Sequence, residues 1–431
     1  MKSLIFIFFF LIITEFFVRA QEPTKLLVDR QEYFPLPDSA GGWRTLTDNK
    51  TIRQVTGIDK VKLDQVFDFI RSTTNNGGLL VVRHGWLVYE KYFGKGQREA
   101  TPNLASFGKA FTSISVGILM SERPDIFPNG LDQKVYTTIL MPPEAFPLPD
   151  PRMANIKLGQ LLTHTSGIRG NNPVYVNGKT STIDPVGPDG WFSNVDDYSL
   201  GHKDGKIGNV PFSTKTLWCK PGGGFSYATA ALHNASIMLR HVTGLELQDY
   251  IESHLAKPLG WSLWGYGNKN QPLLTHTPGG GGIALRSTDV LRFCYMLLHQ
   301  GRWNLHQIVP KEYIQKATKT TPYNPHFPYY SLQFKVNSDG YIPELPGDSY
   351  SWGGSGGYCF WVIPSLDLIV WKLGGRDDQY SFANTGLPEP PKLSDAIKPI
   401  NDGQVHEGKI DDIKMIIMAI SSIVDEKKLG L

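Results

Sequence analysis

The chain has 431 residues, of which 41% are hydrophobic and 12% aromatic, and its formal net charge is +3. Such a chain can bury a sizeable core, as one large domain or as two closely packed lobes. The small net charge and the absence of a long block of like charges argue against a surface made for nucleic acids or other polyanions.

The start of the chain predicts a signal peptide over residues 1–20. Lys2 supplies a positive charge, residues 4–13 are nearly all apolar, and a tolerated cleavage sequence ends at Ala20. A membrane anchor is the alternative, but Thr14 and Glu15 interrupt an apolar run that is already short for a bilayer span. We therefore expect an exported protein, periplasmic or extracellular, that keeps no stable membrane anchor after cleavage.

An arm, a helix and a hairpin are predicted next. Residues 21–60 are punctuated by Pro, Gly and Asp and are expected to form an N-terminal arm, ahead of a single domain over residues 61–431. A helix is predicted at 63–72. Residues 79–83 and 86–92 then alternate apolar and polar side chains around a His-Gly turn, which predicts a β-hairpin.

The middle of the chain predicts helices joined by long loops rich in glycine and proline. Apolar residues recur at helical spacing directly after Ser106 and in four later segments. The predicted helices are 107–120, 157–163, 229–242, 247–256 and 288–299, the last of them capped by Ser287. An extended loop is expected over 167–223.

Strand signals return near the C-terminus. Residues 358–363 and 366–373 predict a second hairpin that turns at Pro364-Ser365. A last amphipathic helix is predicted over 410–424, with one apolar face made by Ile410, Ile413, Ile417, Ile420 and Val424. Strands at both ends of the chain indicate an α+β fold, in which one antiparallel sheet built from both ends is flanked by helices. A helical lobe, over about residues 110–325, would be inserted into it.

Cysteines and histidines give no sign of thiol or metal chemistry. Cys219, Cys294 and Cys359 are expected to be small hydrophobic residues rather than a disulfide or a thiol nucleophile. The eleven histidines show no H-x-H or H-E-x-x-H grouping. Neither a metal site nor a cofactor is therefore expected.

The chemistry is expected to begin at Ser106. Ser106 and Lys109 stand at the start of a predicted helix, where side chains three residues apart share a face. A hydroxyl needs a base at hydrogen-bond distance to act as a nucleophile, and a lysine is such a base when its surroundings lower its pKa. The N–H groups of a helix start also favour a developing oxyanion. A surface Ser and Lys on an ordinary helix is the alternative.

Two glycine-rich segments offer the remaining groups. Residues 221–226 form a turn that places Tyr227 at a helix start, where its hydroxyl can exchange a proton with the nucleophile and the leaving group. A buried tyrosine that only packs is the alternative. Residues 352–358 enter a strand whose glycines permit close approach, so that one backbone N–H can join that of Ser106 in an oxyanion hole. The alternative there is a bulge or turn before an edge strand.

In this order, these motifs resemble those of the penicillin-recognising serine hydrolases, and above all the class C β-lactamase-like branch. The branch includes D,D-peptidases, esterases and 6-aminohexanoate-dimer hydrolases. The resemblance covers about residues 60–375, and it implies the same sheet with an inserted helical lobe. The matching segments are Ser106-x-x-Lys109, Leu161-Leu162-Thr163-His164-Thr165-Ser166-Gly167, Pro221-Gly222-x-x-Phe225-x-Tyr227 and Trp352-x-Gly354.

The resemblance implies a role for each matching residue. Ser106 would be the acylated nucleophile, Lys109 its activating partner, and Tyr227 the general base and acid. Gly354 and Ser355 would belong to the third-motif strand, with the Ser355 N–H in the oxyanion hole. The histidine of the second matching segment, His164, is expected to brace its loop rather than to act in catalysis.

Three departures from the family pattern concern the second motif, the third motif and deacylation. The second motif usually reads Tyr-x-Asn, but Thr229 stands in the place of the Asn. Trp352 stands where many relatives have a cation that would bind a substrate carboxylate, which argues against efficient β-lactam hydrolysis. The chain has no E-x-x-L-N element of the class A type, so deacylation would rely on Tyr227 and Lys109.

Two other tyrosines match the short second-motif pattern. They occur in Tyr175-Val176-Asn177 and Tyr266-Gly267-Asn268, but neither segment follows a Pro-Gly turn. Tyr227 is therefore preferred as the catalytic tyrosine, and Tyr175 is kept as a substrate-binding residue.

The sequence thus predicts a serine hydrolase that cleaves an amide or ester bond through acyl-Ser106. Trp352 suggests an uncharged group beside the scissile bond, and hence an esterase or amidase more than a β-lactamase. The expected partner is a small-molecule or short-peptide substrate, and the oligomeric state stays open. The alternative is a catalytically silent relative that binds a cell-wall or peptide ligand. The missing Asn and cation motivate it, while the intact Ser106–Lys109 pair argues against it.

Overall fold

The computed structural model describes residues 32–181, 196–207, 210–212, 214–267, 276–400 and 409–424. The predicted signal peptide and the first part of the N-terminal arm lie outside the described residues. The chain divides into a unit of Met1–Glu32 and a unit of Tyr33–Leu431, and all elements below belong to the second unit.

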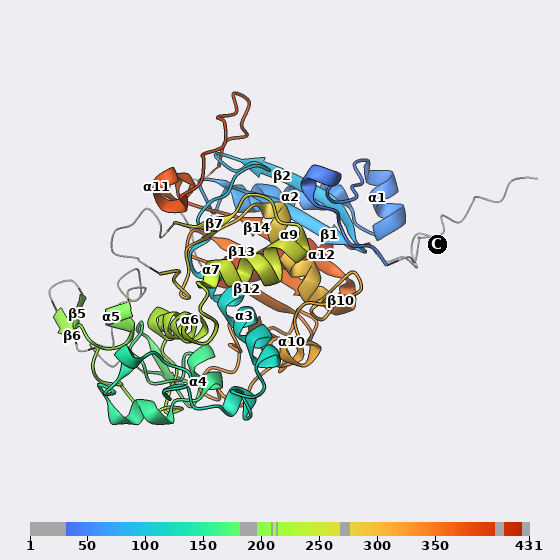
Figure 1. Ribbon diagram of the computed structural model, residues 1–431. Coiled ribbons are helices and arrows are strands. Elements are labelled where there is room, and N and C mark those ends of the chain that lie inside the picture. The colour runs from blue at the N-terminus through green and yellow to red at the C-terminus, as the bar shows by residue number, and fades with distance from the viewer. Residues whose placement is uncertain are drawn as a thin grey trace, which may run out of the picture. The chain divides into compact units, whose positions relative to one another are not determined.

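A six-stranded antiparallel sheet joins the two ends of the chain. Figure 1 shows its blue N-terminal strands beside orange C-terminal ones, in the order β11-β12-β13-β14-β1-β2. The predicted sheet is therefore confirmed. Its strands are β1 (Gly77–Arg83), β2 (Trp86–Phe93), β11 (Lys335–Val336), β12 (Tyr350–Gly354), β13 (Tyr358–Ile363) and β14 (Leu368–Leu373).

Both predicted hairpins are present. Strand β1 is buried along its whole length and lies between β2 and β14, with Val81 opposite Val370. The second hairpin differs at its turn, where a short 3-10 helix covers Pro364–Leu366 and Asp367 adopts a left-handed φ of 45°. Strand β14 therefore starts at Leu368, two residues later than expected.

Helices cover both faces of the sheet, because side chains of a strand alternate between its faces. On one face, Leu79 and Val81 of β1 join a core with helices α2 (Lys60–Arg71) and α12 (Lys409–Ser421). On the other face, Leu80 and Val82 join a larger core with α3 (Gly108–Glu122) and α9 (Ser287–Leu298).

The predicted apolar face of the last helix is wrong. Among the described side chains of α12, Met415, Ile416 and Ala419 are fully buried, whereas Ile413, Ile417 and Ile420 are only half-buried against the same core. The side chain of Ile410 lies outside the described residues. Apolar residues surround much of the helix, so periodicity alone did not identify the side that packs on α2.

The helices between the two sheet segments make up most of the lobe that Figure 1 shows in green and teal. Sequence spacing placed the longer helices correctly, and the predicted helix at 247–256 runs on as a single turn of π-helix over Glu252–Ala256. The other helices are α1 (Asn49–Thr56), α4 (Leu158–Leu162), α5 (Asp196–Ser199), α6 (Thr229–Thr243), α7 (Leu247–Ile251), α8 (Lys257–Leu259), α10 (Lys311–Ala317) and α11 (Phe382–Thr385).

Short two-stranded ribbons complete the described structure. The predicted extended loop 167–223 contains two of them, separated by residues outside the described ranges. The ribbon strands are β3 (Val174–Val176), β4 (Lys179–Ser181), β5 (Gly205–Ile207), β6 (Val210–Phe212), β7 (Gly265–Tyr266), β8 (Ile283–Ala284), β9 (Arg302–Trp303) and β10 (His306–Gln307).

A buried ionic cluster ties the described part of the N-terminal arm to α9. The Arg292 guanidinium is fully buried and lies 2.7 Å from both Asp289 and Asp38. The expectation that Ser287 caps α9 is wrong: the cap is Arg286, and the Ser287 hydroxyl instead accepts a hydrogen bond from the indole of Trp371 at 3.0 Å.

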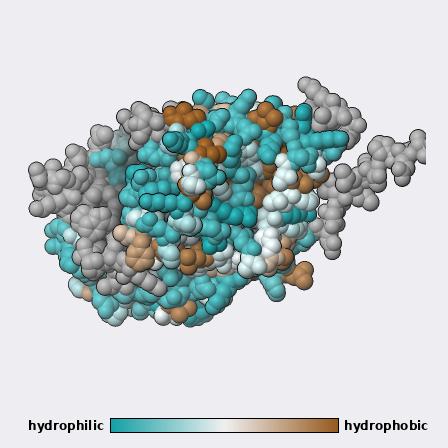
Figure 2. Space-filling view, turned by 90° about the horizontal axis from the view of Figure 1, so that it is seen from above, coloured by the Kyte–Doolittle hydropathy of each residue, from teal (hydrophilic) through white to brown (hydrophobic). Residues whose placement is uncertain are grey.

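The surface and the cysteines are unremarkable in the described ranges. Figure 2 shows a largely hydrophilic face on which hydrophobic residues gather in small, separate groups. None of the described helices is both long and apolar enough to span a bilayer. All three cysteines are free, and Cys294 and Cys359 are buried as expected.

Candidate active site

Ser106 and Lys109 meet at the start of α3. Ser106 lies in a short 3-10 helix, η2 (Ala105–Phe107), that continues directly into α3. The Lys109 Nζ donates a hydrogen bond to the Ser106 Oγ at 3.0 Å. Lys109 is fully buried, whereas Ser106 is half-buried. The spacing of the two residues in the sequence therefore does bring amine and hydroxyl together, at a serine that stays partly exposed.

The backbone before Ser106 is strained. Ala105 has a φ of 50°, in the left-handed region that non-glycine residues rarely adopt. Its carbonyl accepts a hydrogen bond from the Gly282 N–H at 3.0 Å, which helps to hold this conformation. Strain of this kind persists only where surrounding structure enforces it, and it is common at active sites.

The glycine run 279–282 supplies a second partner for Lys109. The Nζ also donates to the Gly280 carbonyl at 2.6 Å, and one turn later the Thr112 hydroxyl donates to the Gly279 carbonyl at 2.6 Å. A side chain at Gly281 would crowd the Ala105 carbonyl, and Gly281 has a φ of 150°. This role was not predicted from the sequence, although four consecutive glycines are a signal for a close backbone approach.

Tyr227 lies beside Lys109. The Nζ is 4.7 Å from the centre of the Tyr227 ring, and that ring lies 4.6 Å from the ring of His164. Tyr227 is half-buried and precedes α6 by two residues. The structure thus brings Ser106, Lys109 and Tyr227 into one neighbourhood.

The two alternative tyrosines occupy different places. Tyr266 is buried in β7, where burial raises the pKa of its hydroxyl, and Asn268 lies outside the described residues. Tyr175 pairs through its backbone with Phe225, and its ring stacks on Phe327 at 4.5 Å. Tyr175 therefore borders the segment that carries Tyr227.

An aromatic series links Tyr175 with the third motif. Phe327 stacks on Tyr330 with ring centres 6.5 Å apart, and Tyr330 meets Trp352 edge-on at 5.2 Å. Tyr330 also lies 6.4 Å from Tyr227. Because Tyr175, Tyr227 and Phe327 are half-buried, part of this series is open to solvent near the Ser106–Lys109 pair.

His164 holds the second-motif segment in place. It is only 2% exposed and adopts a left-handed φ of 59°. Its Nδ1 accepts a hydrogen bond from the backbone N–H of Ala228 at 3.1 Å, directly after Tyr227. Burial first, and the charge of Lys109 second, hold the pKa of His164 well below its usual value of 6.5. A neutral, inward-facing imidazole agrees with the expected bracing role.

Replacing His164 with Asn is expected to make the free energy of unfolding depend less on pH below about 6.5. The folded protein resists protonation of His164, so its stability falls as pH drops below about 6.5, by up to about 1.4 kcal/mol per pH unit. His164→Asn keeps an acceptor for Ala228 and tolerates a positive φ, but it does not titrate. Urea unfolding of both proteins at intervals from pH 7.5 to 4.5 measures the difference, and parallel profiles would contradict it.

Strand β12 is attached to the backbone around Ser106. The Trp352 indole N–H donates to the Ser106 carbonyl at 3.0 Å, and Trp352 is only 3% exposed. A side chain at Gly354 would overlap the Leu104 carbonyl oxygen. Ser355 follows, exposed, in the turn after β12. Trp352, expected to face the substrate, is thus buried against the backbone of Ser106.

Two residues that sequence reasoning missed lie at the end of this strand. The Gln379 amide donates to the Asn103 carbonyl at 3.0 Å and to the Ser355 carbonyl at 2.9 Å, joining the two segments. The Arg376 guanidinium donates to the Ser355 hydroxyl at 3.3 Å and lies 3.7 Å from Asp378. Both residues follow β14 in the chain. A local sequence pattern does not indicate contacts with residues as distant in the sequence as Asn103 and Ser355.

Among the residues that the structure describes, no three His, Cys, Asp or Glu side chains form a group suited to a metal ion. The expectation of a site without a metal or cofactor stays a prediction.

Comparisons with known proteins agree on the fold. A family model described as Beta-lactamase matches residues 71–379. No curated protein matches the chain. Among solved structures, a suspected beta-lactamase from Bacteroides dorei DSM 17855 is 20% identical, with a TM-score of 0.56 over 85% of this chain and 99% of its own. EstCE1, a hydrolase with promiscuous acyltransferase activity, is 16% identical, with a TM-score of 0.54, and the match covers 85% of this chain and 98% of EstCE1. The simvastatin synthase LovD from Aspergillus terreus is 15% identical, with a TM-score of 0.54, and the match covers 84% of this chain and 97% of LovD.

Proposed function

The chain belongs to the Beta-lactamase family, and on that basis we propose that it is a serine hydrolase that cleaves an ester or amide bond through an acyl-Ser106 intermediate. The observation that carries the proposal is the 3.0 Å contact between the Lys109 amine and the Ser106 hydroxyl, with the amine fully buried. A buried amine beside a hydroxyl is an arrangement that activates a serine nucleophile.

The proposed reaction has two halves. First, the Ser106 Oγ attacks the carbonyl carbon of the substrate, its proton passes to Lys109 or Tyr227, and the C–O or C–N bond breaks as the leaving group takes up that proton. Water then attacks acyl-Ser106, and its proton returns through the same groups to the Ser106 oxygen. The products are a carboxylic acid and an alcohol or amine. We assign Lys109 and Tyr227 to both halves because the Lys109 amine contacts the Ser106 hydroxyl at 3.0 Å and lies 4.7 Å from the centre of the Tyr227 ring.

The proposed oxyanion hole uses the backbone N–H groups of Ser106 and Ser355. Support comes from the attachment of β12 to the nucleophile segment by Trp352 and Gln379. Donors held this firmly need no rearrangement when charge develops on the substrate oxygen.

An apolar, uncharged acyl group is the proposed specificity. The half-buried rings of Tyr175, Phe327 and Tyr227 border the proposed site. In the third motif, Trp352 stands where many relatives have a cationic side chain. Arg376 offers positive charge next to Ser355, but it already lies near Asp378. Uncharged esters are therefore expected to react faster than substrates with a carboxylate beside the scissile bond.

Labelling with a fluorophosphonate tests the proposal. Intact-mass spectrometry is expected to show one adduct on the wild type and none on Ser106→Ala, because the probe phosphonylates an activated serine. Ser121→Ala is the matched control: it removes an exposed serine at the far end of α3 and should label normally. Absence of an adduct on the wild type, or its persistence on Ser106→Ala, would overturn the proposal.

A substrate panel separates turnover from mere binding. It contains short-chain esters, D-amino-acid peptides, nylon-type oligomers and β-lactams, each with Ser106→Ala as the blank. Fast release of product from uncharged esters supports the hydrolase. A wild type that takes the label but turns over no member of the panel would favour a silent relative that binds its ligand.

A further inference from the structure

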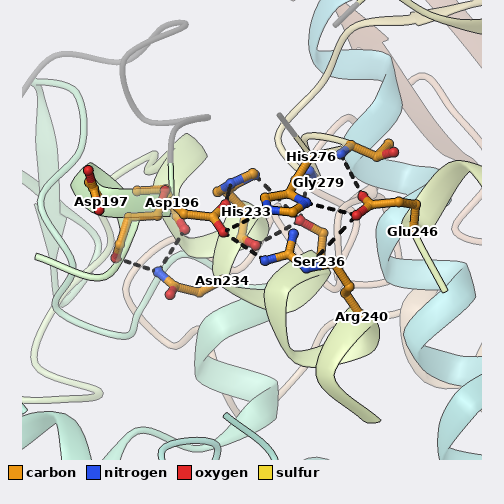
Figure 3. Close-up of polar contacts among 12 residues, drawn as sticks. Asp196, Asp197, His233, Asn234, Ser236, Arg240, Glu246, His276 and Gly279 are labelled. Carbon is orange, nitrogen blue, oxygen red and sulfur yellow. Dashed lines mark hydrogen bonds and ion pairs between the residues drawn. The ribbon is translucent and has the colours of Figure 1, made fainter. Parts of the chain in front are cut away.

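A charged network lies against α6 (Figure 3). Its centre is Asp196, which lies 2.8 Å from the His233 Nε2 and 2.7 Å from the Arg240 guanidinium. A second carboxylate, Glu246, lies 2.8 Å from the His276 Nδ1 and accepts the Thr277 backbone N–H at 2.8 Å. The network therefore fixes both α6 and the chain that leads into the glycine run 279–282.

A path of hydrogen bonds runs from this network to the Lys109 amine. The Ser236 hydroxyl donates to the His233 carbonyl at 2.8 Å and lies 3.4 Å from the His233 Nδ1. The same oxygen accepts the Gly279 N–H at 3.1 Å. The carbonyl of the next residue, Gly280, receives the Lys109 Nζ at 2.6 Å. Figure 3 shows His233 and Ser236 between Asp196 and Gly279.

The path is buried and closely packed. His233 is fully buried and Ser236 is 2% exposed. A side chain at Gly279 would overlap the Leu232 carbonyl oxygen, so the glycine run lies directly against α6. In such a setting, loss of one hydrogen-bond partner leaves a polar group without water, and the backbone it held moves.

We propose that Ser236, His233 and Asp196 are positioning residues that keep the Lys109 amine in place for Ser106, acting through the backbone of Gly279 and Gly280. The inference rests on the proposed function of Ser106 and Lys109. None of the three side chains touches the substrate or the reacting atoms. Their effect is to hold the carbonyl that orients the amine, and through Gly282 the same run also holds the backbone of Ala105.

The test compares phosphonylation rates and steady-state ester hydrolysis in variants of the full chain. Ser236→Ala and His233→Leu are expected to slow labelling and to lower kcat by about 10- to 100-fold, with KM changed less than about threefold, because a small displacement of a catalytic group affects the reaction more than binding. His233→Gln keeps an N–H for Asp196 and is expected to recover most of the rate. His241→Gln, an exposed change on the same helix, is the matched control.

The outcomes separate the positioning role from folding and from the proposed function. Should Ser236→Ala fail to fold, Asp196→Ala carries the test, because Asp196 is partly exposed. Wild-type rates in variants that lose the Ser236 or His233 contact would overturn the positioning role while leaving the hydrolase intact. Equal losses in His233→Gln and His233→Leu, or a parallel rise in KM, would also overturn it. An unreactive wild type would overturn both proposals together.

Discussion

Replacing Lys109 with Met is expected to slow acylation of Ser106 by about 10²- to 10⁴-fold. Methionine fills a similar buried volume but can neither accept the hydroxyl proton nor donate to Ser106 and Gly280. The nucleophile then keeps its proton, as an ordinary serine does at neutral pH. Stopped-flow or manual time courses of fluorophosphonate labelling, followed by intact mass, give the rate directly.

Two controls accompany this change. Lys311→Met removes an exposed lysine from α10 and should label at the wild-type rate. Thermal unfolding of Lys109→Met shows whether the protein is folded during labelling. A folded Lys109→Met that labels within tenfold of the wild type would mean that another group activates Ser106.

Replacing Gly354 with Ala is expected to lower the acylation rate by about 10²- to 10³-fold, the usual effect of losing an oxyanion-hole donor. The new methyl group would overlap the Leu104 carbonyl oxygen, so β12 must move away from the segment that carries Ser106. That movement separates the Ser355 N–H from the Ser106 N–H. Labelling rates and steady-state ester hydrolysis both report the loss.

A second glycine provides the matched control for Gly354. At Gly347 an added methyl group would meet only the Asn337 carbonyl oxygen, at 3.9 Å. Gly347→Ala is therefore expected to keep activity and stability, whereas Gly354→Ala should also lose about 1–3 kcal/mol in the free energy of unfolding, measured in urea. Full activity in Gly354→Ala would show that the close approach of β12 has no part in the reaction.

Local patterns were sufficient for much of the fold. Alternating apolar and polar residues identified the first hairpin, and two strand signals around Pro364-Ser365 identified the second. Helical spacing of apolar residues identified α3, α6 and α9, because that period reflects which side of a helix faces a core. Local reasoning failed where two sides of an element are similarly apolar, as in α12, and where a side chain has a distant partner. Ser287 looked like a helix cap but bonds Trp371 from the sheet.

In the candidate site, too, contacts between neighbouring residues could be predicted from the sequence, whereas contacts between distant segments could not. Ser106 and Lys109 lie close together because one helical turn separates them, and any chain that forms this helix start brings them together. The Gly280 carbonyl, the Gln379 amide, the Arg376 charge and the path through Ser236 come from segments far away in the chain. Their contacts depend on how the sheet, α6 and the glycine run pack, and local periodicity carries no information about such packing. The amino-acid sequence therefore specified the Ser106–Lys109 contact, while the tertiary structure supplied the backbone and side chains that hold it in position.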